Sequence, residues 1–193
     1  MTHTPKLLCL GFGYSAKTLA ALLQAEGWRV AGTTRSDEKA ARLRLDNVEA
    51  HLWSGEALDP RWLEGVTAIL ISTPPGDMGC PAFIAASKAI AERSEQFRWI
   101  GYLSTNGVYG DHQGAWVNEE SELLGASPRA LRRIEAERNW LSLAEQQDLP
   151  LMVFRLPGIY GPGRSALDAV HVGKARRIYK EGQVFSRMHV EDI

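Results

Sequence analysis

The sequence has few cysteines, no long hydrophobic run and almost no excess of charge, and each absence excludes a class of protein. Two cysteines in 193 residues, Cys9 and Cys80, make no disulfide framework and have no metal-ligand spacing. No apolar stretch approaches the ~20 residues that span a bilayer, and the apolar run near the N-terminus is too short for a secretory signal. Lysine and arginine number 22 against 23 acidic residues, so the net charge of −1 argues against nucleic acids or anionic membranes as partners. With 45% hydrophobic residues, we expect a packed cytoplasmic protein.

Short apolar runs alternate with segments of helical periodicity along the whole chain. The pattern predicts strands over residues 7–10, 28–33, 48–53, 66–71, 99–103 and 151–154, and helices over residues 14–26, 36–44, 82–94 and 129–145. Strands that are apolar on both faces and alternate with helices predict an α/β fold, a doubly wound parallel sheet with helices on both faces. No repeat or linker interrupts the pattern, so we expect one domain over residues 1–193.

A glycine-rich turn joins the first predicted strand to the first predicted helix. Its sequence is Gly11-Phe12-Gly13-Tyr14-Ser15-Ala16, the G-x-G-x-x-A form of a dinucleotide-binding turn. The first glycine allows the tight turn, the second lets the backbone approach a pyrophosphate, and the N–H groups that open the helix face the phosphates. The turn predicts a Rossmann-type nucleotide site, and the alternative is a strand–helix turn without a ligand.

The end of the second predicted strand distinguishes the two pyridine nucleotides. An NAD site usually has an acidic residue there that binds the ribose 2′-hydroxyl, but this chain has Thr34, Arg35 and Ser36. An arginine between hydroxyl residues complements a 2′-phosphate, so the sequence favours NADP over NAD. In the alternative interpretation Arg35 lies in an exposed loop and Asp37 or Glu38 binds the ribose of NAD.

Three later stretches, residues 102–110 (YLSTNGVYG), 155–163 (RLPGIYGPG) and 185–193 (FSRMHVEDI), carry a family resemblance. In this order they resemble the signatures of the extended short-chain dehydrogenases/reductases, which include NAD-dependent epimerases and dehydratases of nucleotide sugars. More narrowly, the chain resembles the atypical epimerase/dehydratase-like members. The resemblance implies an NAD(P)-binding oxidoreductase or epimerase/dehydratase-like protein acting on a small polar substrate, with a nucleotide sugar as one candidate.

The resemblance also implies roles for particular residues. Thr105 takes the place of the catalytic hydroxyl that polarises the substrate, with Ser104 as the neighbouring candidate. Both hydroxyls could instead simply end a strand. The residues expected along the cofactor are Ser72, Thr73, Leu156, Pro157 and Gly158, the last three against the nicotinamide.

The family's acid–base pair, Tyr-x-x-x-Lys, is missing. Its two positions fall on Arg129 and Arg133, and no tyrosine or lysine occurs between residues 111 and 156. A guanidinium stays protonated near neutral pH, so Arg129 cannot exchange a proton, whereas Arg133 could still hold the nicotinamide ribose. In the alternative interpretation, Arg133 and Glu137 form an exposed i,i+4 pair on a solvated helix face.

Other candidates for acid–base chemistry are Tyr109, Glu119, His112 and His189. We expect Tyr109 to be structural, as it usually is in the family, and no cluster of residues has the spacing of a metal site. In that family more chain follows the segment that resembles residues 189–193, so residues 157–193 are expected to be a partial start of the substrate-binding region.

Two functions remain open at this point. The first is the NADP-dependent enzyme just described, and the second is a catalytically silent dinucleotide-binding sensor or scaffold that has lost the tyrosine and lysine. Members of the family often pair through two helices, so a homodimer involving residues 129–141 is one expectation.

Overall fold

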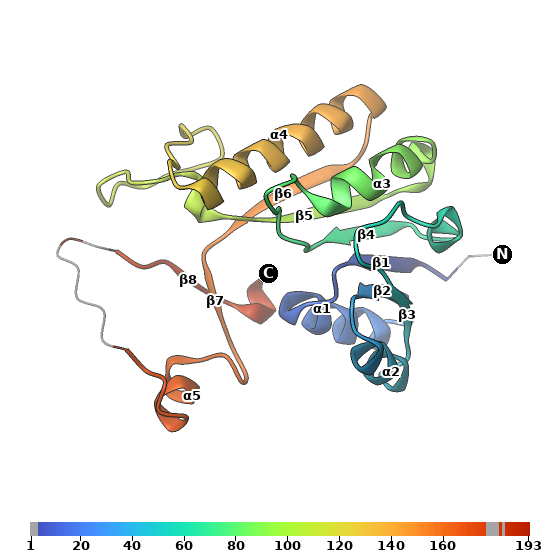
Figure 1. The fold of residues 1–193 in the computed structure, drawn as a ribbon, viewed down its shortest axis with the longest axis horizontal. Coiled ribbons are helices and arrows are strands. Elements are labelled where there is room, and N and C mark those ends of the chain that lie inside the picture. Colours follow the sequence, from blue (N-terminus) through green and yellow to red (C-terminus); the bar gives the residue numbers. More distant parts are fainter. Residues whose placement is uncertain (1–3, 177–181, 183) are drawn as a thin grey trace.

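Six parallel strands form the main sheet of the computed structural model, in the order β3-β2-β1-β4-β5-β6 (Figure 1). The structure describes residues 4–176, 182 and 184–193, so part of the expected 1–193 domain and of its 157–193 region lies outside the described residues. The strands are β1 (Lys6–Leu10), β2 (Arg29–Thr34), β3 (Val48–Leu52), β4 (Ala68–Ile71), β5 (Trp99–Thr105) and β6 (Leu151–Leu156).

Two pairs of helices enclose the sheet. The helices are α1 (Tyr14–Ala25), α2 (Asp37–Leu45), α3 (Pro81–Ala91) and α4 (Pro128–Gln147). α1 and α2 lie on one face, and α3 and α4 lie on the other (Figure 1). The expected doubly wound Rossmann-type fold is therefore confirmed.

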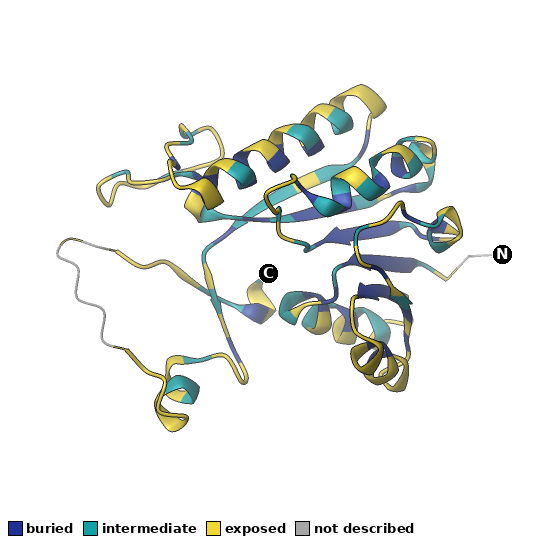
Figure 2. Cartoon of the chain, in the orientation of Figure 1, coloured by how far each residue is buried: buried dark blue, intermediate teal, exposed yellow. Residues whose placement is uncertain are grey.

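The alternation of side chains along β1 divides the core into two layers. Leu8 and Leu10 pack toward α3 and α4, whereas Leu7 and Cys9 pack toward α1 and α2. All four side chains are buried because successive residues of a strand point to opposite faces, and here both faces are covered (Figure 2). Burial raises the pKa of the Cys9 thiol, which therefore stays protonated and has a structural role.

Most predicted boundaries differ from the observed ones by one to three residues, and three of these differences are informative. The helix expected to reach residue 94 ends at Ala91, and a 3-10 turn over Ser94–Gln96 follows it. The strand expected from residue 66 begins at Ala68, because the N–H of Val66 still donates to the carbonyl of Leu63 in a turn. The β5 strand continues to Thr105 rather than residue 103, since β6 pairs with it to that point.

The C-terminal part adds a small parallel pair of strands outside the main sheet. β7 (Gly158–Tyr160) pairs with β8 (Arg187–His189), and the short helix α5 (Ala166–His171) lies between them in sequence. The chain ends in a 3-10 turn over Val190–Asp192, whose first residue is buried beside α1. Among the described helices, none combines the length and the apolar character needed to cross a membrane.

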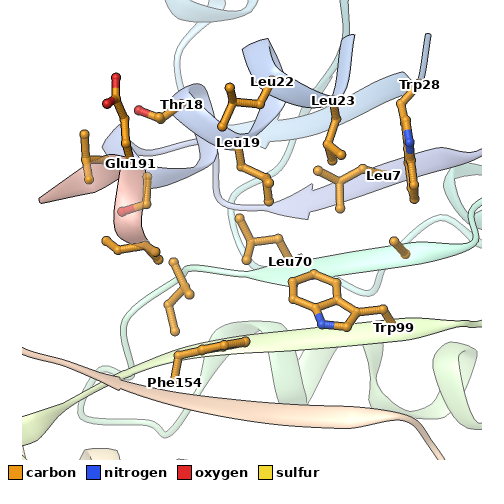
Figure 3. Close-up of a pocket in the computed structure, with 15 residues that line it drawn as sticks. Leu7, Thr18, Leu19, Leu22, Leu23, Trp28, Leu70, Trp99, Phe154 and Glu191 are labelled. Carbon is orange, nitrogen blue, oxygen red and sulfur yellow. The ribbon is translucent and has the colours of Figure 1, made fainter. Parts of the chain in front are cut away.

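An apolar hollow of about 280 Å³ lies on the α1 side of the sheet (Figure 3). Leu19 and Leu23 of α1 form one wall, and Leu70, Trp99 and Phe154 of the strands form the other. The hollow offers few hydrogen-bonding groups, so it is a partly uncovered region of the core rather than a place for polar chemistry.

Candidate functional site

The glycine turn between β1 and α1 is crowded at its first glycine and open at its second. Gly11 has a φ of +86°, and a Cβ at this position would lie 2.9 Å from Thr73 Cγ2. The N–H of Gly11 donates to Thr33 Oγ1 at 2.7 Å, and its carbonyl accepts from Ser72 Oγ at 2.5 Å. Gly13 has an ordinary φ of −96°, and nothing lies within 4 Å of its Cβ position. A ligand can therefore approach the backbone at Gly13.

The amino end of α1 faces this open space. Gly13 caps the helix without a side chain, and the N–H of Lys17 makes the first helical hydrogen bond, to the Gly13 carbonyl at 3.0 Å. The N–H groups of residues 14–16 precede that bond and have no partner within the helix. Such N–H groups, together with the helix dipole, favour a bound phosphate.

Two further hollows meet at the turn, at the carboxyl ends of the strands. We call them the β2-side hollow, of about 530 Å³, and the β5-side hollow, of about 560 Å³. Gly13, Ser72 and Pro74 line both of them. Ligands of open α/β sheets usually bind at this edge.

Phe12 contributes its backbone to the β2-side hollow while its ring packs into the core. The side chain is 4% exposed, and it occupies the space that a Cβ on Gly32 would need. The carbonyl of Phe12 accepts a hydrogen bond from Lys39 Nζ. The Phe12 ring therefore leaves the hollow free.

The end of β2 presents Arg35 at the rim of the same hollow. Arg35 is exposed, and within the described residues it has neither an ion pair nor a hydrogen bond. Thr34 Oγ1 accepts from the N–H of Ser36 at 3.4 Å. Ser36 Oγ in turn accepts from the N–H of Lys39 at 3.2 Å, so Ser36 caps α2.

The two acidic residues of the alternative interpretation lie outside the β2-side hollow. Asp37 and Glu38 are in the first turn of α2, and Glu38 pairs with Arg42 one turn further on. The described lining of this hollow therefore carries cations and no carboxylate.

Sequence reasoning missed several residues of the β2-side hollow. Lys39, Trp53, Ser54 and Gly55 all line it. The last three follow β3, whose carboxyl end meets the same edge of the sheet as that of β2. The strand order, which the sequence alone did not give, would have identified them.

The two hydroxyls at the end of β5 have different environments. Ser104 is buried and donates to Glu137 Oε1, so its hydroxyl is used within the core. Thr105 is half-buried, lines the β5-side hollow, and accepts from the N–H of Gly107 at 3.2 Å. Among the described residues, the Thr105 hydroxyl has no hydrogen-bond partner outside this turn. Of the two candidates, it is therefore the one that can contact a ligand.

The segment after β6 forms another wall of the β5-side hollow. Leu156, Pro157 and Gly158 line it, as do Tyr14 and Ser15 of the glycine turn.

The side chain of Tyr14 spans from α1 to the loop after β7. Its hydroxyl donates to the carbonyl of Pro162 at 3.0 Å, and the guanidinium of Arg164 lies 5.4 Å from the ring centre. Gly161 makes room for this contact, since a Cβ there would lie 2.6 Å from the Tyr14 hydroxyl.

The interpretation of Arg133 and Glu137 as an exposed pair on a solvated helix face is wrong. Arg133 is 8% exposed and Glu137 is 1% exposed. Together with Ala130, Ala136 and Trp140 they form the face of α4 that packs on the sheet, at the three- and four-residue spacing of a buried stripe. Each residue has partners on the strands instead of the other.

Two hydrogen bonds to residues of β5 hold the guanidinium of Arg133 in place. Its Nη1 donates to the carbonyl of Leu103 at 2.9 Å and to the hydroxyl of Tyr102 at 3.2 Å. Burial raises the pKa of Tyr102 to about 12, although the charge of Arg133 opposes the shift. Arg133 also lines the β5-side hollow, where sequence reasoning expected it to hold a ribose.

Glu137 pairs with Arg155 of β6. Arg155 Nη2 lies 3.0 Å from Glu137 Oε2, and Arg155 Nη1 donates to the hydroxyl of Tyr109 at 3.2 Å. With Ser104 on the other carboxylate oxygen, this network ties α4 to the ends of β5 and β6. The network therefore fixes the position of α4, which forms one wall of the β5-side hollow.

The other candidates for acid–base chemistry line neither hollow. Tyr109 has the structural role that was expected, since its hydroxyl accepts from Arg155, and the backbone carbonyl of Glu119 accepts from the same guanidinium. His112 contacts the carbonyl of residue 122, and the His189 ring meets the Tyr160 ring edge to face, with the ring centres 5.2 Å apart. Among the described residues, no group of three or more His, Cys, Asp or Glu side chains could hold a metal ion.

No family model matches the chain. Protein YeeZ of Escherichia coli K12 is 26% identical over 207 aligned residues, which cover 97% of this chain and 70% of that protein. A solved structure of a conserved protein of unknown function from Silicibacter pomeroyi DSS is 48% identical, with a TM-score of 0.88. The match covers 98% of this chain and 65% of that one, so this chain spans about two-thirds of its length.

A more distant likeness involves proteins of named activity. UDP-glucuronic acid 4-epimerase from Bacillus cereus, solved with UDP-glucuronic acid and NAD, has a TM-score of 0.76 at 19% identity. The match covers 97% of this chain and 70% of that enzyme. At this identity the likeness establishes the common Rossmann-type fold.

Proposed function

We propose that the protein binds NADP across the two hollows and acts as an oxidoreductase or epimerase/dehydratase-like enzyme on a small polar substrate. The observation that carries this proposal is the pairing of an open glycine turn with a cationic β2-side hollow. A side chain at Gly11 would collide with Ser72 and Thr73, which follow β4, whereas the space beside Gly13 is free. This is the shape that a backbone cradle for a diphosphate requires.

The residues of the β2-side hollow fit the adenosine half of the nucleotide. The backbone of residues 11–15 would hold the diphosphate, and Arg35 would hold a 2′-phosphate with the hydroxyls of Thr34 and Ser36 beside it. Lys39 adds a second positive charge at the same place. An arginine favours a phosphate because its planar guanidinium donates two parallel hydrogen bonds.

The residues of the β5-side hollow fit the reactive half. NADP supplies hydride transfer at its nicotinamide ring when bound. In the proposal, Ser72 and Thr73 lie along the cofactor, Leu156, Pro157 and Gly158 pack against the nicotinamide, and Arg133 orients the ribose.

Thr105 would act on the substrate itself. Its hydroxyl would donate to a substrate oxygen and stabilise negative charge that develops there. The residues 158–160 and 187–189, which pair beside this hollow, are proposed as the start of the substrate-binding region.

The 2′-phosphate assignment is tested by comparing two nucleotides. Arg35→Ala should weaken NADPH binding by about 10- to 100-fold, as expected for loss of hydrogen bonds to a charged group. NADH binding should change little, because it has no 2′-phosphate. Arg42→Ala, which removes a guanidinium from the exposed side of α2, is the matched control and should affect neither nucleotide. Equal losses for both nucleotides in Arg35→Ala would refute the assignment.

A non-catalytic binding module is the second candidate, and the absence of a proton donor at Arg129 favours it. A substrate screen that follows NADPH absorbance separates the two. Turnover that Thr105→Val abolishes supports the enzyme, whereas tight nucleotide binding without turnover of any substrate supports the module.

A further inference from the structure

The β5-side hollow has an unusual balance of charge. Arg129, Arg133 and Arg164 line it, and its described lining contains no aspartate or glutamate. The three arginines come from two separate parts of the chain, the first two turns of α4 and the loop after β7. The fold thus brings three guanidinium groups to the place where a substrate would meet the cofactor.

The three arginines that line the β5-side hollow have no carboxylate partner among the described residues. Among the described residues, no carboxylate lies within ion-pair distance of Arg129, Arg133 or Arg164. Arg132, which lies between the first two on α4 but points away from the hollow, pairs with Asp77, and Arg155 behind the hollow pairs with Glu137. Other described arginines without an ion pair, such as Arg35 and Arg138, are exposed to solvent, whereas Arg133 is buried.

Burial makes the unbalanced charge of Arg133 significant. The side chain is more than nine-tenths buried, and its described hydrogen bonds go to two neutral acceptors, a carbonyl and a phenol. A buried guanidinium without a counter-charge is unfavourable, and a second arginine four residues away adds repulsion. An anion in the hollow would supply a counter-charge to Arg133 and reduce the repulsion between the two arginines.

We propose that the β5-side hollow binds an anionic oxygen group of the substrate, a carboxylate or a phosphate, through Arg129, with the charge of Arg133 favouring the anion from beside the ribose. This inference rests on the proposed function, because it places the substrate beside the nicotinamide in the β5-side hollow and the cofactor's diphosphate at the glycine turn. Arg129 takes the position of the proton-exchanging tyrosine in the family that the sequence resembles. In this chain, Arg129 serves to recognise charge, and proton exchange is not among its roles.

Guanidinium geometry supports this assignment over a neutral sugar or alcohol. Arginine binds carboxylate and phosphate through two parallel hydrogen bonds, and Asn106, Thr105 and Ser127 around the same hollow add polar groups for the rest of a small molecule. The anion could also belong to the cofactor itself, and the experiment must therefore separate the two sources.

The test measures binding of malonate, inorganic phosphate and uncharged malonamide by calorimetry, with and without saturating NADP+. We expect malonate or phosphate to bind while NADP+ is bound, and malonamide not to bind. Arg129→Gln should weaken anion binding by about 10-fold or more, as the loss of a charge-assisted pair predicts, and Arg129→Lys should weaken it less. Arg138→Gln, on the exposed side of the same helix, is the matched control and should have no effect.

Three results would overturn the inference. Competition between malonate and NADP+ would assign the arginines to the cofactor's phosphates. If Arg129→Gln and Arg138→Gln weakened anion binding equally, the attraction would be non-specific. If neither malonate nor phosphate bound, the hollow would have no anion site. The proposed function is judged separately by NADP+ titration of the same sample. If the protein failed to bind NADP+ but bound the anion, and Arg129→Gln abolished that anion binding, the dinucleotide site would be rejected and the anion site retained.

Discussion

The two hollows that meet at Gly13 are built in different ways. The β2-side hollow is formed by a glycine turn, a helix cap and short segments that follow consecutive strands, so its shape depends mainly on the backbone. The β5-side hollow is formed by side chains from α4, β5 and the segment after β6, which the Glu137–Arg155 pair holds together. The shape of the β2-side hollow therefore depends little on the identity of its side chains, whereas that of the β5-side hollow depends on side chains such as Arg129 and Arg133.

The largest effect should come from breaking the support behind the β5-side hollow. Glu137→Leu leaves the Arg155 guanidinium without its carboxylate, and removing one partner of a buried pair costs about 3–5 kcal/mol. Thermal unfolding should show this as a fall in Tm of roughly 6–20 °C. Glu135→Leu, on the exposed side of the same helix, is the control and should leave Tm nearly unchanged. Similar melting of both variants would mean that the pair does not support the fold.

The next effect tests whether the two hollows share one ligand. Gly13→Val places a side chain in open space that lines both hollows, so the fold should tolerate it while binding of NADPH and NADH both fall by about 100-fold or more, equivalent to about 2.8 kcal/mol. Nucleotide titration together with a thermal melt measures the two quantities. Gly76→Val, also in open space but outside both hollows, is the control. Undiminished nucleotide binding by Gly13→Val would remove the turn from the site.

A smaller effect distinguishes the hollows by pH. Burial raises the pKa of Tyr102 beneath the β5-side hollow to about 12, above its unfolded value of about 10. Since the folded state favours the protonated phenol, its contribution is complete below pH 10 and is lost as the pH rises toward 12. Urea unfolding at several alkaline pH values should show a steeper loss of stability for the wild-type protein than for Tyr102→Phe. Parallel curves would contradict the raised pKa.

The smallest effect concerns the cap of α2 beside the β2-side hollow. Ser36→Ala removes the hydrogen bond to the Lys39 N–H and should lower the free energy of unfolding by about 1 kcal/mol. Ser36→Asp keeps a capping oxygen but places a negative charge beside the proposed 2′-phosphate. It should retain stability in a urea titration and weaken NADPH binding more than NADH binding. Unchanged preference between the nucleotides in Ser36→Asp would place the 2′-phosphate elsewhere.

The parts of the molecule that local sequence specifies were predicted well. Each main-sheet strand and each of its four covering helices was expected at nearly its observed position, because apolar periodicity and turn residues act over a few neighbours. The start of the helix expected over residues 36–44 is the clearest case, because Ser36 caps it by binding an N–H only three residues away. The glycine turn was located for the same reason.

The parts that depend on distant contacts were not predicted. The i,i+4 spacing of Arg133 and Glu137 allowed an exposed surface pair as one alternative, but Glu137 pairs with Arg155, eighteen residues away in sequence. Lys39 and Trp53 could not be assigned to the β2-side hollow without the strand order. The pairing of β7 with β8 joins segments with little apolar periodicity, and it too was missed. The homodimer stays a prediction.

A crystal structure of the protein soaked with NADP+ tests the central claim most directly. The account predicts the diphosphate against the N–H groups of residues 13–15, the 2′-phosphate beside Arg35, and the nicotinamide in the β5-side hollow near Thr105. A nucleotide bound elsewhere, or crystals that stay free of it at saturating concentration, would contradict the claim that these two hollows form one dinucleotide site.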